Sequence, residues 1–528
     1  MKGNLFPASY PKSSVTDKKT LALIVLGSML IATCEDVAAQ TAPPSQWTAP
    51  ISLPLVPVAA ANLPNGKVLV WSADSPLDFT GGEVNLNKHE NNGGTYTAIF
   101  DPVAETSTQV LVSNIGHDMF CPGIANLPDG DILVTGGSSS AKVSAFNPDS
   151  GHWTSQKPMN IPRAYQGSVT LSNGDVFALG GSWNGGLGGK SGETWSKSGW
   201  RKNTAVTANW GDPDVTDDAA GIYRADNHMW LFADSNGMVF HAGPSRAMQW
   251  ISTAGTGSIS ASGNRGADND AMTGNAVMYD VRKILAVGGA PDYENDYATS
   301  NATLIDISSR AANTRTIAPM NYQRAFANSV ALPDGEVVVV GGQTYAQPFS
   351  DDNAVLTPEI WSPATESFTP LAAQKIPRTY HSIALLLPDG RVLSGGGGLC
   401  GGCSTNHPDV EILTPPYLLN ADGKPASRPT ILSAPANASL GSSISVSTDR
   451  AISAFALMRL SSATHSLNNE QRRVPLSFSA NSADHSKSAD QYVLQIPGDS
   501  GVAVPGYYML FAIDANGVPS VSTTIRIH

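Results

Sequence analysis

The residues best suited to chemistry lie in two short segments, 117–123 (HDMFCPG) and 163–166 (RAYQ). A recurring turn of the type Leu-Pro-Asp-Gly or Leu-Ser-Asn-Gly sets their register, because a Cys, a Tyr, a Phe and a His each stand six residues before one copy of it. These residues are Cys121 (turn 127–130), Tyr165 (turn 171–174), Phe326 (turn 332–335) and His381 (turn 387–390). A thiol, a phenol and an imidazole brought to one structural level can bind a transition metal.

The turn belongs to a longer repeat that runs from Trp47 to about Pro416. In each copy a strand of small residues leads into the turn, an alternating apolar strand follows, and a Gly-Gly pair ends it. These second strands are expected at 67–71, 131–137, 175–181, 283–289, 336–342 and 391–398, with a weaker seventh at 238–243. A period of about 45–60 residues with this pattern is typical of a kelch-type β-propeller, and seven units predict seven blades.

A second domain is expected after the repeat stops. Residues 424–429 (KPASRP) have the composition of a linker, and short alternating strands follow from Thr430 to His528. About 100 residues of this kind fit an immunoglobulin-like β-sandwich. We therefore predict an all-β chain with a seven-bladed propeller over 40–426 and a sandwich over 427–528.

Composition agrees with an exported β-protein rich in turns. The 528 residues include 50 Gly and 36 Pro, only 14% are charged, and the net charge is −12. That charge is spread along the chain, and no basic patch with interleaved aromatic residues is present. Nucleic-acid binding is therefore not expected.

The N-terminus has the features of an export signal. Lys18 and Lys19 precede an apolar run over 21–33, and residues 37–39 (VAA) offer a cleavage site, so 1–39 is the expected signal peptide. The run is shorter than the roughly 20 residues that span a bilayer. We expect a secreted or periplasmic protein without a membrane span in the mature chain; the alternatives are an uncleaved anchor and a lipid attached at Cys34.

The remaining cysteines divide into a pair and a single residue. Cys400 and Cys403 flank a Gly-Gly turn, and an exported protein permits a disulfide between them. Half of a zinc site is the alternative, although the sequence has no second Cys pair. Cys121 is left unpaired in an oxidising compartment and needs an explanation.

The fold would bring the metal-binding residues together. The innermost strand of each propeller blade lines the axis, so residues at one level of those strands point into one small volume. Tyr380 adjoins His381, and both reach one site only if the strand begins there or bulges, which Pro377 just upstream favours. His465, in the segment 461–466 between two sandwich strands, is a candidate fourth ligand. Two imidazoles and two phenolates suit Cu(II).

Six motifs in order resemble the copper-radical oxidases, the family of galactose oxidase and the glyoxal oxidases. They are 117–123, 163–166, 180–186 (GGSWNGG), 223–228 (YRADNH), 378–382 (RTYHS) and 463–465 (ATH). The resemblance extends from about Trp47 to His528. It implies the same propeller and sandwich, with one copper ion.

The resemblance also implies a role for each residue of the centre. Tyr165 and Cys121 would be joined by a thioether bond into a redox-active side chain, which would account for the unpaired cysteine. Tyr165, His381 and His465 would be equatorial copper ligands and Tyr380 the axial one. Trp183 would stack over the cross-linked tyrosine and shield its radical.

By the same resemblance, the reaction would convert a primary alcohol, such as C6 of galactose, to an aldehyde while dioxygen becomes hydrogen peroxide. Tyr380 would take the hydroxyl proton and the Tyr165 radical a hydrogen atom from the carbinol carbon. No dinucleotide-binding fingerprint is present, so no organic coenzyme is expected.

The resemblance further implies five residues as substrate contacts. The forked donors of Arg224 suit vicinal sugar hydroxyls, and Phe79 and Phe349 would be aromatic walls. Tyr293 adjoins Glu294, which stands where galactose oxidase has Gln, so strict galactose preference is in doubt. Little sequence lies between the signal and the first blade, so the N-terminal carbohydrate-binding domain of galactose oxidase is not expected.

We therefore predict a galactose oxidase-like enzyme, acting as a monomer on a small alcohol or sugar with dioxygen. The alternative within enzymes is an oxidase of the glyoxal oxidase kind. The alternative outside enzymes is a non-catalytic kelch protein that binds carbohydrate, but it would not need Cys121, both tyrosines and both histidines together.

Overall fold

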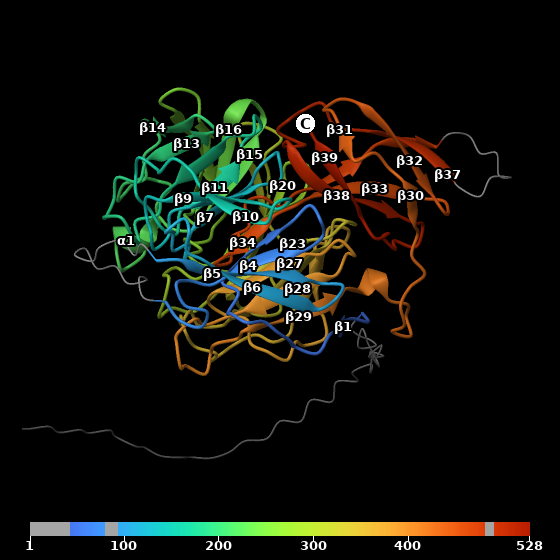
Figure 1. Cartoon of the computed structure of the whole chain (residues 1–528), viewed down its shortest axis with the longest axis horizontal. Helices are drawn as coiled ribbons and strands as arrows, with labels where there is room; N and C mark the ends of the chain where they lie inside the picture. Colours follow the sequence, from blue (N-terminus) through green and yellow to red (C-terminus); the bar gives the residue numbers. More distant parts are fainter. Residues whose placement is uncertain (1–42, 80–92, 481–489) are drawn as a thin grey trace, which may run out of the picture. The chain divides into compact units, whose positions relative to one another are not determined.

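The computed structural model describes residues 43–79, 93–480 and 490–528. The predicted signal peptide, 1–39, lies outside the described residues. Almost every element is a strand (Figure 1); the described residues include one short α-helix, α1 (Ile222–Ala225), and two 3-10 turns, η1 (Ser235–Gly237) and η2 (Pro416–Leu418). None of these helices is long and apolar enough to cross a membrane.

Seven antiparallel sheets form the blades of the propeller, and in six of them four strands follow one another in chain order. The first four blades are β3–β6 (Ala59–Asn62, Val68–Trp71, Thr95–Asp101, Thr106–Val112), β7–β10 (Gly123–Asn126, Ile132–Thr135, Val143–Asn147, His152–Ser155), β11–β14 (Gly167–Thr170, Val176–Leu179, Gly192–Ser196, Gly199–Asn203) and β15–β18 (Trp230–Asp234, Met238–Gly243, Ala247–Ser252, Ser258–Asn264). The next two are β19–β22 (Asn275–Asp280, Lys283–Val287, Ala302–Asp306, Asn313–Thr316) and β23–β26 (Ala325–Ala331, Val337–Gln343, Glu359–Ser362, Ser367–Pro370).

The seventh blade joins the two ends of the propeller. It contains β27 (Ser382–Leu386), β28 (Val392–Gly396) and β29 (Asp409–Thr414), and both β1 (Gln46–Trp47) and β2 (Ile51–Ser52) pair with β29. Strands from opposite ends of the repeat therefore lie side by side in one sheet (Figure 1). This pairing closes the ring by main-chain hydrogen bonds and leaves β29 no open edge there.

The C-terminal residues form two further sheets. One has the order β30–β32–β37–β36 (Ile431–Ser433, Ser443–Thr448, Asp490–Gln495, Phe478–Ala480) and the other β31–β39–β38–β33–β35 (Asn437–Ala438, Thr523–Ile527, Gly506–Ile513, Ala454–Arg459, Arg473–Leu476). A shared core that includes Phe455, Tyr492 and Leu510 holds the two sheets together. The predicted fold, a seven-bladed propeller followed by an immunoglobulin-like sandwich, is confirmed; the boundary at 426 and 427 stays a prediction.

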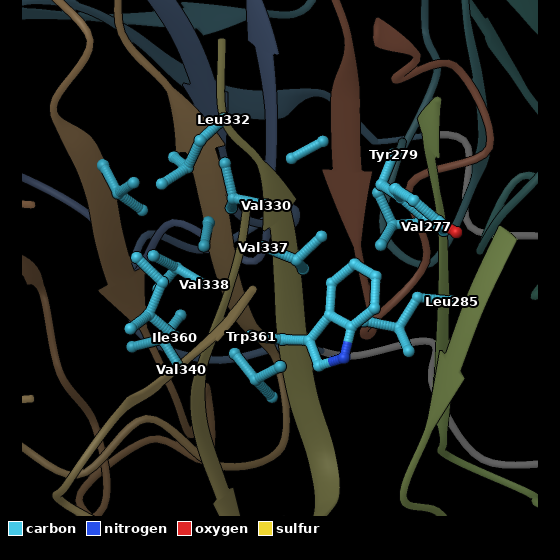
Figure 2. Close-up of a cluster of buried hydrophobic side chains, with 14 of the residues drawn as sticks. Val277, Tyr279, Leu285, Val330, Leu332, Val337, Val338, Val340, Ile360 and Trp361 are labelled. Atoms are coloured by element: carbon cyan, nitrogen blue, oxygen red, sulfur yellow. The ribbon is translucent and has the colours of Figure 1, made fainter. Parts of the chain in front are cut away.

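Neighbouring blades pack through apolar side chains on both of their faces. Figure 2 shows the cluster between the blades β19–β22 and β23–β26, where the Trp361 and Tyr279 rings meet edge to face at 4.8 Å. Val337, Val338 and Val340 of β24 are at most 1% exposed, because alternate residues of one strand contact different neighbouring layers. One blade alone would leave such faces in water, so the ring is stable only as a whole.

The first strands of the blades surround the axis, as predicted. Each of these strands from β7 through β27 contacts the first strand of the next blade, and β27 contacts β3. Strand β34 (Ser462–Thr464), from the sandwich half of the chain, completes the ring because it pairs with β3 and contacts β7.

The segment after β34 enters the axis and hydrogen-bonds the inner edges of the blades. The side chain of Asn469 donates to Ser168 O and accepts from Leu231 N. Gln471 donates to Ser329 O and accepts from Ala331 N. An inner strand is a sheet edge with unpaired N–H and C=O groups, which are costly to bury. We call residues 461–472 the axial segment; its polar side chains satisfy those groups and fix its position.

Candidate metal centre

The residues at the head of the inner strands share an unusual backbone conformation. Cys121, Tyr165, Phe326 and His381 have φ of 58°, 65°, 60° and 69°. Non-glycine residues seldom adopt positive φ, and each instance costs of order 1–3 kcal/mol unless the surroundings impose it. All four residues lie in or against one buried cluster at the axis. The six-residue register therefore corresponds to one repeated conformation that turns each side chain inward.

The two predicted histidine ligands offer equivalent nitrogen atoms. His381 Nδ1 lies 2.6 Å from Gly398 O, and His465 Nδ1 lies 2.7 Å from Thr464 Oγ1. His381 Nε2 has no hydrogen-bond partner among the described residues. The two rings are 4.5 Å apart. A hydrogen bond at Nδ1 orients an imidazole and leaves Nε2 as the metal donor, as in metal sites generally.

The two tyrosines bring their hydroxyls to the same place. Tyr165 Oη and Tyr380 Oη are 2.8 Å apart, and the Tyr165 ring is 4.7 Å from the His465 ring. Tyr380 and His381 both precede β27, which begins at Ser382, and their rings stack at 3.8 Å. Strand β27 thus begins directly after these two residues. This start is one of the two conditions under which the sequence allowed both Tyr380 and His381 to reach one site.

An extra residue in this blade explains how two neighbours face one site. A buried Arg precedes the inward residue by two positions in two blades, Arg163 before Tyr165 and Arg324 before Phe326. Arg378 precedes His381 by three. Each arginine donates through Nη1 to a glycine carbonyl of its own blade, to Gly180, Gly341 and Gly396 respectively. The hydrogen bond from the arginine to a glycine carbonyl is therefore the same in all three blades, and we call this arginine the anchor. The additional residue lies between Arg378 and β27.

The cysteine lies beside these ligands. Of the three cysteines within the described residues, Cys121 is free and buried, and its Sγ is 3.4 Å from His465 Nε2. Burial raises the pKa of the Cys121 thiol, while a hydrogen bond with the Tyr165 side chain lowers it. The sulfur therefore lies among the metal donors and next to Tyr165. Cys400 and Cys403 form the predicted disulfide, which removes the zinc alternative.

Trp183 covers the tyrosine. Its ring stacks on Tyr165 with 4.6 Å between centroids and 26° between planes. The next residue, Asn184, donates to Ser138 O and so holds this loop against the neighbouring blade. Tyr165 is only 4% exposed. Trp183 therefore covers one face of the Tyr165 ring, the position that the family resemblance implied for it.

The centre keeps its ligands neutral in the absence of a cation. Burial lowers the pKa of His381 to about 3 and lowers the pKa of His465 well below its usual value. Burial, with the neighbouring Cys121, raises the pKa values of Tyr165 and Tyr380. Both imidazoles therefore retain a free lone pair at neutral pH, and a bound cation would favour the phenolates.

These residues fit a copper ion. Donor atoms of Cys121, His381 and His465 all lie within 4.8 Å of one another. His381 Nε2 is buried without a hydrogen-bond partner among the described residues, which a metal bond would satisfy. Two imidazole nitrogens with two phenol oxygens are a donor set that Cu(II) prefers.

The predicted substrate residues lie next to the tyrosines of the centre. The Phe79 and Phe349 rings are stacked at 5.9 Å, and Phe349 meets Tyr380 edge to face at 5.0 Å. On another side, the Arg224 guanidinium lies 5.5 Å from the Tyr293 ring and pairs with Glu294 at 2.8 Å. Phe349 and Tyr293 thus both contact Tyr380, while Phe79 contacts Phe349 and Arg224 contacts Tyr293. We refer to the five as the pocket residues.

Two inward residues escaped the sequence analysis. His228 and Thr273 also have positive φ, 54° and 62°, and each stands two residues before the first strand of its blade. His228 Nε2 is 3.3 Å from Tyr293 Oη, and its ring is 5.0 Å from the Tyr165 ring. The same count would have found them, because the turns 234–237 (DSNG) and 279–282 (YDVR) begin six residues later.

Comparison with known proteins agrees with this site. The family model for the glyoxal oxidase N-terminus matches residues 83–402, and that for the galactose oxidase-like early set domain matches 428–527. A galactose oxidase of Gibberella zeae is 44% identical over 495 residues, which are 91% of this chain and 70% of the relative. An aldehyde oxidase, GLOX, of Vitis pseudoreticulata is 25% identical over 454 residues, 78% of this chain and 82% of the relative.

A solved structure is also similar along nearly the whole chain. It is a fungal alcohol oxidase of the AA5 family in complex with copper, with a TM-score of 0.85 and 40% identity. The match covers 92% of this chain and 99% of that one.

Fold and site together define a copper-dependent oxidoreductase built on a propeller. The chain belongs to the galactose oxidase family of copper-radical oxidases.

Removal of one imidazole tests the ligand set. In His465→Ala the site loses the donor from the axial segment, and we expect the bound copper to fall from about one ion per chain to below about 0.2. Metal analysis after copper loading and gel filtration measures this. His152→Ala, at an exposed position of β10, should retain the full copper content. One tightly bound ion in His465→Ala would contradict the assignment.

Proposed function

We propose that this chain oxidises the primary alcohol of a galactose-like sugar or a related small alcohol to the aldehyde, and that dioxygen is reduced to hydrogen peroxide. The supporting observation is the convergence of His381 Nε2, His465 Nε2 and the Tyr165 and Tyr380 hydroxyls beside a free cysteine, beneath a stacked tryptophan. This set is what a one-electron side-chain radical next to a copper ion requires. The copper-bound alcohol oxidase and the galactose oxidase to which the chain is similar agree with it.

In the proposed site, each residue of the chain has a definite task. Tyr165, His381, His465 and Tyr380 would hold the ion. Copper would supply a one-electron redox centre and a Lewis acid at which the alcohol oxygen binds. Tyr380 Oη would take the hydroxyl proton, and Tyr165 Oη would take the hydrogen of the carbinol carbon. Trp183 would exclude water from the oxidised tyrosine, because its ring covers the Tyr165 face.

We also propose that the chain is exported and acts as a monomer. An oxidising compartment accounts for the Cys400–Cys403 disulfide. The one chain supplies every residue of the site, including His465 from the C-terminal half, so a second copy is not needed to complete it.

A peroxide-coupled colour assay tests the activity. Galactose, glyoxal and glycerol are offered to the protein before and after copper loading, and we expect peroxide from galactose or glycerol only with the loaded protein. Peroxide from glyoxal alone would favour aldehyde oxidation instead. No peroxide from any substrate after loading would support a carbohydrate-binding propeller without catalysis.

The Cys121–Tyr165 cross-link has a mass signature. Forming a sulfur–carbon bond from an S–H and a ring C–H removes two hydrogens, with dioxygen as oxidant. We expect the copper-treated protein to be about two hydrogens lighter than the same protein before treatment, with the disulfide present in both. Intact-mass measurement checks this.

Cys121→Gly is the matched variant, because glycine readily adopts the φ of 58° found at this position. It should show no mass loss, keep its copper and lose about a hundredfold or more in activity. An unchanged turnover rate in the variant would refute a catalytic cross-link.

Substrate preference is proposed to depend on the ion pair in the wall of the pocket. Glu294 accepts from Arg224 Nη2 at 2.8 Å, and the guanidinium is further enclosed by the rings of Trp183, Tyr223 and Tyr293 at 5.1–5.5 Å. One donor of its fork, Nη2, is thus already engaged, whereas Nε has no hydrogen-bond partner among the described residues. A sugar must compete with a carboxylate for Nη2, whereas an alcohol without vicinal hydroxyls does not.

In Glu294→Gln the neutral amide should bind the Arg224 guanidinium less strongly, so that its N–H donors are more available to a sugar. We expect the KM for galactose to fall about tenfold, equivalent to ~1.4 kcal/mol, and the KM for benzyl alcohol to change less than about twofold. Steady-state peroxide kinetics measure both. Asp296→Asn, two residues along the same loop, removes the same charge without touching Arg224 and serves as the control. Equal effects of the two substitutions would mean that only net charge matters.

A further inference from the structure

Two loops carry three of the five pocket residues, and each loop also carries a tyrosine outside that set. Residues 291–298 supply Tyr293 and Glu294 to the pocket, and residues 344–350 supply Phe349. Tyr297 and Tyr345 lie on the same two loops, and their rings meet edge to face with 5.0 Å between centroids. We call this the tyrosine pair. Neither residue contacts the metal ligands in the ring contacts described above.

The tyrosine pair is held in place by the main chain of the two loops. Asn295 N donates to Ala346 O at 2.7 Å, Ala346 N donates to Asp296 O at 2.8 Å, and Ala298 N donates to Thr344 O at 3.0 Å. The buried Gln343 side chain donates to the carbonyls of Tyr345 and Gln347 from below. The pair is therefore presented on a fixed backbone.

One ring of the pair is nevertheless exposed to solvent, and the other, Tyr345, is half-buried. Tyr297 is 70% exposed, whereas Tyr293, four residues earlier, is 1% exposed. The backbone bonds that join the loops need no aromatic side chain, and a ring that buries so little area adds little to folding stability. A second exposed apolar residue, Phe349 at 37%, lies on the second loop and reaches Tyr380 with its other edge. Exposed aromatic side chains thus lie on both loops that carry the pocket residues.

The spacing matches a sugar chain. Tyr297 stands three positions after Glu294, which limits the distance between their Cα atoms to about 10 Å. Phe349 stands four positions after Tyr345, which limits the distance between their Cα atoms to about 14 Å. A pyranose ring is ~5 Å across, so the tyrosine pair lies within one or two sugar units of the pocket. The apolar face of a pyranose packs against an aromatic ring, and polar groups beside the ring bind its hydroxyls. The Asp296 carboxylate and the exposed Asn295 provide such groups next to Tyr297.

We propose that the tyrosine pair is a carbohydrate subsite outside the metal pocket, which binds the second or third sugar of an oligosaccharide whose terminal galactose-like residue enters the pocket. Which end of the oligosaccharide enters the pocket rests on the proposed alcohol oxidation. Binding of carbohydrate to the tyrosine pair does not depend on turnover. It assigns a side-chain role to Tyr297 and Tyr345 that the metal chemistry does not require.

Kinetics with two substrates test the position of the subsite. Methyl α-galactoside fills the pocket alone, and a galactose-terminated trisaccharide of a galactomannan also reaches the pair. In Tyr297→Ala we expect kcat/KM for the trisaccharide to fall about three- to tenfold, with that for the methyl galactoside within about twofold of the parent. Tyr297→Phe keeps the ring and should retain the parent values. Tyr322→Ala removes an exposed tyrosine outside both loops and is the matched control.

Binding without turnover is measured by electrophoresis of the copper-loaded protein through gels containing galactomannan. The parent and Tyr322→Ala should be retarded, and Tyr297→Ala and Tyr345→Ala should migrate faster. Equal losses for both substrates, or retardation that survives both tyrosine substitutions, would overturn the subsite. If the parent oxidises no galactoside, the proposed alcohol oxidation on sugars fails, and the retardation of the variants decides the subsite by itself.

Discussion

The centre depends on hydrogen bonds between the axial segment and the inner edges of the propeller. A closed ring of sheets leaves its innermost strands without partners on the axis side, and buried main-chain groups there must be satisfied. Asn469, Glu470 and Gln471 satisfy them with side-chain amides and a carboxylate, for example Glu470 Oε1 with Thr170 N at 2.7 Å. Each such bond also fixes the segment, and β34 holds the other end against β3. His465 lies between these two attachments, so its Nε2 has little freedom to leave the site.

The blades supply the remaining candidate ligands by repetition of one conformation. A residue with positive φ at the head of an inner strand turns its side chain toward the axis, and the surrounding sheets bear the cost of this strain. The same position carries Cys121 in one blade, Tyr165 in the next and His381 in another. Because the positions are equivalent, different chemistry requires only a different side chain. The single inserted residue after Arg378 adds Tyr380 without disturbing the arginine anchor.

Burial governs the properties of these groups. In the closed cluster, neutral forms are favoured, so the imidazoles are available as ligands and the phenols keep their protons until a cation is bound. Outside this cluster, Arg224 and Glu294 form a partly exposed ion pair at 2.8 Å. The buried cluster that could hold a metal is therefore distinct from the side chains proposed to govern the choice of substrate. The low-dielectric centre and the partly exposed wall thus respond to different substitutions.

The sequence by itself determined the class of fold, the number of blades and the level of Cys121, Tyr165 and His381, because turns and strand lengths are local and their spacing is visible in one chain. It missed His228 and Thr273, because the turns that begin six residues after them, DSNG and YDVR, do not have the Leu-Pro-Asp-Gly pattern. Only the tertiary structure decided which nitrogen of His465 faces the site, that Glu294 pairs with Arg224 across 70 positions, and that Tyr297 meets Tyr345. Such contacts join segments distant in sequence, and their geometry depends on how whole sheets pack, which no local pattern encodes.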